Sequence, residues 1–475
     1  MTDFIEGESR SQSTLFPESL DEYIADDNAV RVVDVFIDEL DLGELGFKAE
    51  PEAVGRPAYH PATLLKLYVY GYLNKVTSTR QLEQEANRNV ELMWLTKRLA
   101  PDFKTIADFR KNNGKAIRKV CAEFVLLCKQ LKLFSESMVA IDGSKFKAVN
   151  SRDRNYTSAK VKRRLADVER SINGYLNKLD KADLGVSGEG DARVKDLQGK
   201  IASLKEEMQR LKKRQEQVEQ APDKQVSDTD PDSRSMKSRG SGIVGYNVQA
   251  AVEPANHLIV HHEVTNEGSD RNQLAKIAKQ AKKAMGKKTL DVVADRGYFN
   301  SKEIAKCESR KIKPAVPKPQ TSNSKAAGRY GKEDFVYLAD TDTYRCPAGE
   351  ELRYRFTSKE NKLKLKVYWS DACGNCPQKA QCTTGKERRI KRWKKEEILE
   401  RMQERLDESP DLMRIRRQTV EHPFGTLKAW MGHTHFLMKT QKHVQTEMSL
   451  HVLSYNMKRV MNILGVIPLI AAIRA

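Results

Sequence analysis

Two short apolar segments that each run into an aspartate constrain the fold of this chain more than any other feature. "MVAIDGSKF" leads to Asp142 and "TLDVVADRGYF" leads to Asp295. A glycine follows each aspartate within two residues, which allows the backbone to turn sharply there. Taken alone, either aspartate is typical of a turn or a cap, but the repeated pattern predicts two strands of one sheet that carry carboxylates at their ends.

The segments around these strands predict a layered α/β domain with a central sheet. "GYNVQAAVEP" and "HLIVHHEVTN" are expected to form a β-hairpin that turns at residues 254–256. A helical stretch over residues 272–285 precedes the second aspartate segment, and "KIKPAVPKP" is expected to add one more short strand. Strands and helices mixed in this order are typical of a sheet covered by helices.

A first insertion, residues 155–225, has the apolar spacing of two long helices. The apolar positions recur every three or four residues over 161–179 and again over 197–218. The polar, glycine-bearing "DLGVSGEGDA" separates the two stretches, so we expect an antiparallel helical hairpin. A dimerising coiled coil is the alternative use of the same stripe.

A second insertion, residues 324–385, has alternating strand-like stretches and four of the seven cysteines. These four are Cys346, Cys373, Cys376 and Cys382. Four thiolates could close a tetrahedral zinc site that holds together a small β insertion without a large core. Reduced structural thiols are the alternative, because only one pair has the Cys-x2-Cys spacing.

The remaining cysteines and several histidines are expected to have structural roles. Cys121, Cys128 and Cys307 lie in apolar or helical contexts and are predicted to be packing residues. The histidines considered as metal ligands, and predicted instead to be structural, are His261, His262, His422, His433 and His435. The sequence shows neither a signal peptide nor an apolar run of about 18 residues, so a cytosolic protein without membrane contact is expected.

Residues 1–135 have a helical pattern, with apolar residues three to four apart in "HPATLLKLYVYGYLNKV". Helix starts are predicted at Ser78, with Gln81 as its capping-box partner, and at Thr105, with Asp108. Short helices with basic first turns suit a helix-turn-helix-like DNA reader, and a plain helical bundle is the alternative. The chain has 84 Lys+Arg against 65 Asp+Glu and a net charge of +19, which favours a polyanionic partner over an inert basic surface.

Carboxylates gathered at strand ends need a counter-charge, and a divalent cation can supply it. Two Mg²⁺ ions about 4 Å apart can assist in-line phosphoryl transfer, and such a site typically needs a third carboxylate. Glu421 in "RRQTVEHPFGTLKAW" is the candidate, since it is the only acid between Asp411 and Glu447. Pro423 predicts that a helix begins near Glu421 or kinks there.

Three blocks, "AIDGSKFKA", "VADRGYF" and "RRQTVEHPFGTLK", resemble the signature blocks of DDE transposases encoded by bacterial insertion sequences. That class has a ribonuclease-H-like core. The third block carries Arg417, Glu421 and Lys428 at the family's spacing, although Arg414 stands where the family usually has tyrosine. "LFPESLDEYI", "PDFKTIADFR" and "GYNVQAAV" extend the resemblance, which covers most of the chain and one particular branch of these enzymes.

The resemblance implies a set of site residues. The catalytic and metal-binding residues would be Asp142, Asp295 and Glu421, which would hold two Mg²⁺ or Mn²⁺ ions. The residues expected to contact DNA are Arg417 and Lys428, and in the same blocks Lys145, Arg296 and Tyr298. Basic side chains of this kind neutralise phosphates without reading sequence.

The expected domains are a helical, DNA-end-binding region over 1–135, a catalytic core split between 136–323 and 386–470, and the two insertions. The implied function is a transposase that binds terminal inverted repeats, cleaves phosphodiester bonds and joins 3′-hydroxyl ends to target DNA. Its partner would be double-stranded DNA, as a homodimer or larger assembly in the bacterial cytoplasm, at the nucleoid when bound to DNA. The alternatives are a nuclease that does not join strands and a catalytically idle DNA-binding regulator.

Overall fold

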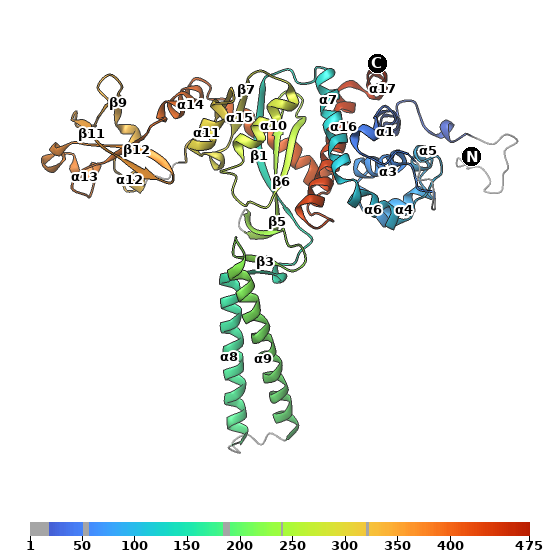
Figure 1. The fold of residues 1–475 in the computed structure, drawn as a ribbon, viewed down its shortest axis with the longest axis horizontal. Coiled ribbons are helices and arrows are strands. Elements are labelled where there is room, and N and C mark those ends of the chain that lie inside the picture. The colour runs from blue at the N-terminus through green and yellow to red at the C-terminus, as the bar shows by residue number, and fades with distance from the viewer. Residues whose placement is uncertain (1–18, 51–56, 184–190, 239–240, 320–322) are drawn as a thin grey trace, which may run out of the picture. The chain divides into compact units, whose positions relative to one another are not determined.

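A computed structural model describes residues 19–50, 57–183, 191–238, 241–319 and 323–475 (Figure 1). The chain forms two compact units. The first unit comprises Met1–Glu136, Asp142–Gly268 and Gln418–Ala475, and the second comprises Ser137–Ile141 and Ser269–Arg417. Strand β1 (Met138–Lys147) and helix α15 (Leu412–Gly425) each run from one unit into the other.

The amino-terminal region of the first unit is entirely helical, as predicted. It consists of η1 (Leu20–Tyr23), α1 (Ala29–Asp38), α2 (Leu42–Leu45), α3 (Pro61–Leu73), α4 (Thr79–Ala86), α5 (Val90–Leu95), α6 (Phe103–Asn112) and α7 (Gly114–Gln130). Helix α3 is buried over most of its length because apolar residues occupy nearly every side of it. The Tyr68 hydroxyl donates to the Ile106 carbonyl at 2.7 Å, which ties α3 to α6.

The helix starts in this region differ in detail from those predicted. Ser78 does precede α4, but its side chain makes no capping hydrogen bond. Helix α6 starts earlier than predicted, because Asp102 accepts from the backbone N–H groups of Lys104 and Thr105. Thr105 lies inside the helix and donates its hydroxyl to Asp102 at 2.6 Å. An aspartate one turn upstream is therefore the cap that the sequence pattern missed.

The first unit also holds a mostly antiparallel part of the central sheet, in the order β4-β5-β1. The long strand β5 (Ser241–Val252) pairs with β4 (Arg234–Ser238) and then with β6 (Ile259–Thr265). The hairpin of β5 and β6 turns where the sequence predicted. Gly245 permits the close approach of β1, because a Cβ there would lie 2.0 Å from the Phe146 carbonyl oxygen. Helix α16 (Gln441–Leu464) contacts β6, α3 and α7, and it is therefore buried on almost every side.

In the second unit the sheet continues in parallel, in the order β1-β7-β8. Strand β7 (Leu290–Ala294) pairs with β1 from Met138↔Asp291 to Ile141↔Ala294, and β8 (Ile312–Ala315) pairs with β7. The helices of this part are α10 (Leu274–Met285), η3 (Arg296–Tyr298), α11 (Ser301–Glu308) and α14 (Glu396–Glu408). The predicted mixed α/β fold with a central sheet is confirmed.

The first insertion forms the expected antiparallel hairpin of α8 (Ser158–Asp183) and α9 (Asp191–Gln220), which lie side by side in Figure 1. It follows η2 (Arg152–Arg154), and the short strands β2 (Asn155–Thr157) and β3 (Gln225–Ser227) pair at its base. Val168, Ile172 and Leu211 form its buried seam. The apolar stripes of the two helices therefore pack against each other within one chain.

The second insertion is a five-stranded antiparallel sheet in which each strand pairs with the next along the chain. Its strands are β9 (Val336–Leu338), β10 (Thr343–Arg345), β11 (Glu351–Glu360), β12 (Leu363–Trp369) and β13 (Ile390–Trp393). The short helices of this region are α12 (Asn323–Ala326), η4 (Lys332–Asp334), η5 (Asp371–Asn375) and α13 (Lys379–Cys382). The predicted end at residue 385 is too early, because β13 pairs with β12 and Ile390 joins the small core.

After α15 the chain forms the π-helical turn η6 (Thr426–Trp430), then α16 and α17 (Val466–Arg474). Within the described residues no single helix has the length and hydropathy of a membrane span. Helices α16 and α17 reach the length and hydropathy of a span only when they are counted as one segment, and the chain bends by 108° between them.

The hairpin seam gives a direct test of the packing. Leu211→Asp puts a carboxylate into a buried apolar seam, so we expect amide hydrogen exchange across α8 and α9 to quicken strongly while the other helices stay protected. Leu176→Asp is the matched control, because Leu176 is exposed on the same hairpin. Equal protection in the two variants would contradict the seam.

Candidate active site

Asp142 and Asp295 follow directly after the last paired positions of β1 and β7. The parallel register ends at Ile141↔Ala294, and the next residue in each chain segment is the aspartate. The apolar residues before them are buried, which is why these segments form the centre of the sheet. Strand β1 does not end at Asp142 as predicted but continues to Lys147, since Phe146 is buried and Ala148 donates its N–H to the Val244 carbonyl.

Each aspartate is oriented by the glycine that follows it. The Gly143 N–H donates to the Asp142 side chain at 2.8 Å, and the Gly297 N–H donates to the Asp295 side chain at 2.8 Å. Asp295 thereby caps η3. A Cβ at Gly297 would lie 2.9 Å from the Asp295 side-chain oxygen, so a larger residue there would displace the carboxylate from this position. A carboxylate has about four acceptor sites, and one such bond leaves capacity for a metal ion.

Glu421 lies in the middle of α15 with its side chain exposed. A helix start at this point is wrong, because α15 begins at Leu412 and continues through Pro423 to Gly425. Proline has no N–H to donate to the carbonyl four residues back, which is that of Thr419. The His257 imidazole makes a hydrogen bond to the Thr419 backbone instead. Its ring also stacks on that of His422, with the ring centroids 4.9 Å apart. The helix is thus supported where proline would otherwise interrupt it.

Lys428 is held against β1 in the first unit. Its Nζ donates to the Ser144 hydroxyl at 2.7 Å and to the Lys145 carbonyl at 3.0 Å. The same ammonium lies 4.5 Å from the centre of the Phe146 ring, at the distance of a cation–π contact. The residue predicted to touch DNA therefore also anchors the strand segment that begins at Asp142.

Arg416, which the sequence analysis passed over, is the arginine nearest to Asp295 in the second unit. Its Nη2 lies 3.9 Å from the Asp295 carboxylate, and its side chain is 15% exposed. Arg417 is exposed instead, because adjacent residues on a helix point about 100° apart. The doubled arginine in "RRQTVEH" was the available signal, but sequence alone does not say which of the two turns inward.

The other predicted DNA contacts differ in accessibility. Arg296 is exposed in η3 and Lys145 is half-buried in β1. Tyr298 is fully buried, with 0% of its surface exposed, so its predicted contact with DNA does not fit this structure. An aromatic residue that follows the exposed Arg296 and Gly297 turns into the core, where its apolar ring is stable.

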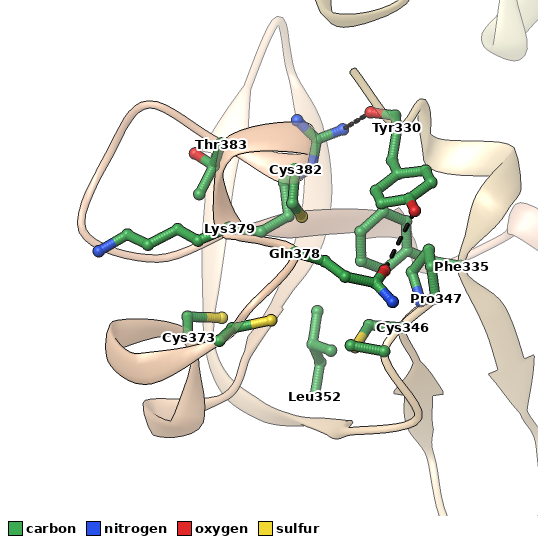
Figure 2. Close-up of a pocket in the computed structure, with 13 residues that line it drawn as sticks. Tyr330, Phe335, Cys346, Pro347, Leu352, Cys373, Gln378, Lys379, Cys382 and Thr383 are labelled. Carbon is green, nitrogen blue, oxygen red and sulfur yellow. Dashed lines mark hydrogen bonds between the residues drawn. The ribbon is translucent and has the colours of Figure 1, made fainter. Parts of the chain in front are cut away.

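The four clustered cysteines line one small pocket of the second unit, and Figure 2 labels Cys346, Cys373 and Cys382 among the side chains around it. Burial and the neighbouring thiols raise the pKa of Cys382. In the described part of the chain their sulfurs do not form a group of three within 4.8 Å of one another. Sulfurs bound to one zinc ion lie about 3.8 Å apart, so the pocket has the right residues but would have to close slightly around the ion.

The remaining cysteines are buried packing residues, as predicted. They are Cys121, Cys128 and Cys307, with exposed fractions of 4%, 1% and 0%. Burial raises the pKa of Cys121 to about 12, which keeps this thiol protonated and unreactive.

Two comparisons with protein families identify the chain as a transposase. The family described as "Transposase domain (DUF772)" matches residues 18–112, and the family described as "Transposase DDE domain" matches residues 135–457. The second match spans more than half of the chain, which therefore belongs to the DDE-domain transposase family.

Other comparisons add little. No curated protein sequence matches the chain. Among solved structures, a chain of a piggyBac transposase synaptic complex with hairpin DNA, determined by cryo-EM, is similar at 8% identity. The similarity covers 94% of this chain and 79% of that one with a TM-score of 0.32, which is too low to carry an argument.

The contact between His257 and Thr419 can be tested by a double-mutant cycle. His257→Asn leaves the Thr419 carbonyl without its donor, and we expect a loss of roughly 1–3 kcal/mol in the free energy of unfolding. In a Pro423→Ala background the new backbone N–H can bond that carbonyl, so the same change should cost clearly less. Urea unfolding of the four proteins measures both values. An equal cost in the two backgrounds would refute the compensation.

Proposed function

We propose that this transposase binds the terminal inverted repeats of its element, cleaves phosphodiester bonds with metal-bound carboxylates, and joins the 3′-hydroxyl ends to target DNA. The family supports a DNA transposase in general. The observation that carries the finer proposal is the register of β1 and β7, which sets Asp142 and Asp295 directly after neighbouring paired positions. Glu421, exposed on α15, is the proposed third carboxylate.

Asp142, Asp295 and Glu421 suit two Mg²⁺ or Mn²⁺ ions by the chemistry of their donors. They supply carboxylate oxygens, which these hard cations prefer, and Glu421 is exposed. When bound, the ions would favour attack by water or a DNA hydroxyl and stabilise the leaving oxygen. Within the chain, the glycine N–H bonds fix the two aspartates in orientation before any ion arrives.

The cationic residues around these carboxylates divide into two proposed roles. Arg417 and Arg296 are exposed and would bind DNA phosphates, as would the half-buried Lys145 of the first block. Lys428 and Arg416 would position the strand and the carboxylate that they contact. Because several phosphate contacts release counterions, binding should weaken steeply as salt rises.

We propose three further roles. The helical region matched as a transposase domain, residues 18–112, would bind the element ends. Two ends must be held together for joining, so a homodimer or larger assembly on double-stranded DNA in the bacterial cytoplasm is proposed. The cysteine pocket would hold a structural zinc ion, since four thiol side chains line it.

The triad is tested by isosteric substitution. Asp142→Asn, Asp295→Asn and Glu421→Gln should each lower Mg²⁺-dependent cleavage of end DNA by on the order of 10³-fold or more, because each removes one ligand charge. Binding of end DNA, measured by gel shift, should change little. Glu404→Gln is the matched control, since Glu404 is exposed on α14. Cleavage retained in any of the three variants would remove that residue from the triad.

A second experiment separates the alternatives. Purified protein, pre-cut element ends and a plasmid target should give joined products if the chain transfers strands. Nicking without joined product would favour a nuclease, and binding without nicking would favour a regulator. Inverted repeats on both sides of the gene would support the transposase at the level of the DNA.

A further inference from the structure

A second group of metal-ligand side chains lies in the first unit, apart from the residues discussed above. It consists of His433, Glu447 and His451, whose ligand atoms all lie within 4.8 Å of one another. Their exposed fractions are 4%, 0% and 1%. Across the described residues, no other set of three histidine, cysteine or acidic side chains is gathered this closely.

The sequence positions explain how the group forms. Glu447 and His451 are four residues apart on α16, so their side chains share one face of the helix. His433 comes from the loop after η6, and its ring stacks on that of His451 with centroids 3.5 Å apart. One turn of a buried helix and one loop residue thus converge from segments that the fold holds in place.

The hydrogen bonds around this group leave nitrogen atoms unused. Glu447 accepts from the backbone N–H groups of Leu437 and Met438 at 2.9 Å each. The His433 Nε2 atom and both ring nitrogens of His451 are buried without a hydrogen-bond partner in the described part of the chain. A buried polar atom without a partner costs about 1–3 kcal/mol, so three in one place call for an explanation.

Burial disfavours the charged forms of Glu447 and of both histidines, as the directions of their pKa shifts indicate. Arg110 is the cationic side chain whose charge acts on Glu447, and its guanidinium donates to the Tyr72 hydroxyl at 2.6 Å. Even with that charge nearby, burial raises the pKa of Glu447. Burial also lowers the pKa of His433 to about 3, which leaves the neutral imidazole that metals bind.

We propose that His433, Glu447 and His451 bind one divalent transition-metal ion, with Zn²⁺ as the best match. Two imidazoles and a carboxylate are a donor set that zinc accepts. The ion would bind one nitrogen of each ring and balance the charge of the buried carboxylate, and Glu447 can offer one or both oxygens. It is a structural ion, because the group is closed to solvent.

The ion would brace the segment that follows Glu421 and Lys428. It would join the loop carrying His433 to α16, and the His433 ring lies 5.2 Å from the Phe146 ring in β1. The Lys428 ammonium contacts the same Phe146 ring, with its Nζ 4.5 Å from the ring centre. Loss of the ion would therefore loosen the loop and the packing of Lys428 on β1.

Metal content and coordination test this proposal in the full chain. The double variant Cys373→Ser/Cys376→Ser removes the other candidate zinc site, and after zinc loading and gel filtration it should keep one equivalent of zinc. X-ray absorption should show nitrogen or oxygen neighbours at about 2.0–2.1 Å and no sulfur at about 2.3 Å. Adding His433→Gln or His451→Gln should lower bound zinc at least about tenfold. His435→Gln, an exposed neighbour, should have no effect.

The controls keep the result decisive. Circular dichroism checks that each variant is folded. The X-ray absorption measurement uses the cysteine variant with all its histidines in place, so it tests the site even if a histidine variant fails to fold. A cysteine variant without bound zinc, or one whose zinc survives both histidine substitutions, would overturn the proposal. Zinc bound only through sulfur in the wild-type chain would also overturn the proposal. His433 and His451 would then be a stacked pair of neutral rings without a metal.

Discussion

The parallel pairing of β1 with β7 is the constraint on which the candidate active site depends. Four consecutive positions pair, and successive apolar residues of both strands are buried, so both faces of the sheet are covered here. With the register held, Asp142 and Asp295 must follow at adjacent positions. Each then needs only a glycine N–H to fix its carboxylate.

The position of Glu421, the proposed third carboxylate, depends on the continuity of helix α15. Pro423 removes a backbone donor inside the helix, and His257 supplies the bond to Thr419 in its place. The π-helical turn that follows brings Lys428 onto Ser144 and Phe146. His257, His422 and His433 thus pack around the segment that carries Glu421.

Much of the fold could be predicted because it follows from local patterns. The hairpin of β5 and β6, the helical hairpin of α8 and α9 and the strand before each aspartate have apolar patterns that a single chain displays locally. Some details were missed. Asp102 rather than Thr105 caps α6, which is a local choice between two neighbouring caps. The addition of β13 to the small sheet and the inward turn of Tyr298 depend on neighbours distant in sequence.

The sequence by itself determined the residue types of this protein: carboxylates after apolar strands, an isolated glutamate among basic residues, and four cysteines in one insertion. These residue types and their spacing can be read directly from one sequence. Only the tertiary structure decided that Arg416 rather than Arg417 approaches Asp295, and that His433 meets Glu447 and His451. Such choices depend on which face of a helix is buried, and distant segments of the chain set that face.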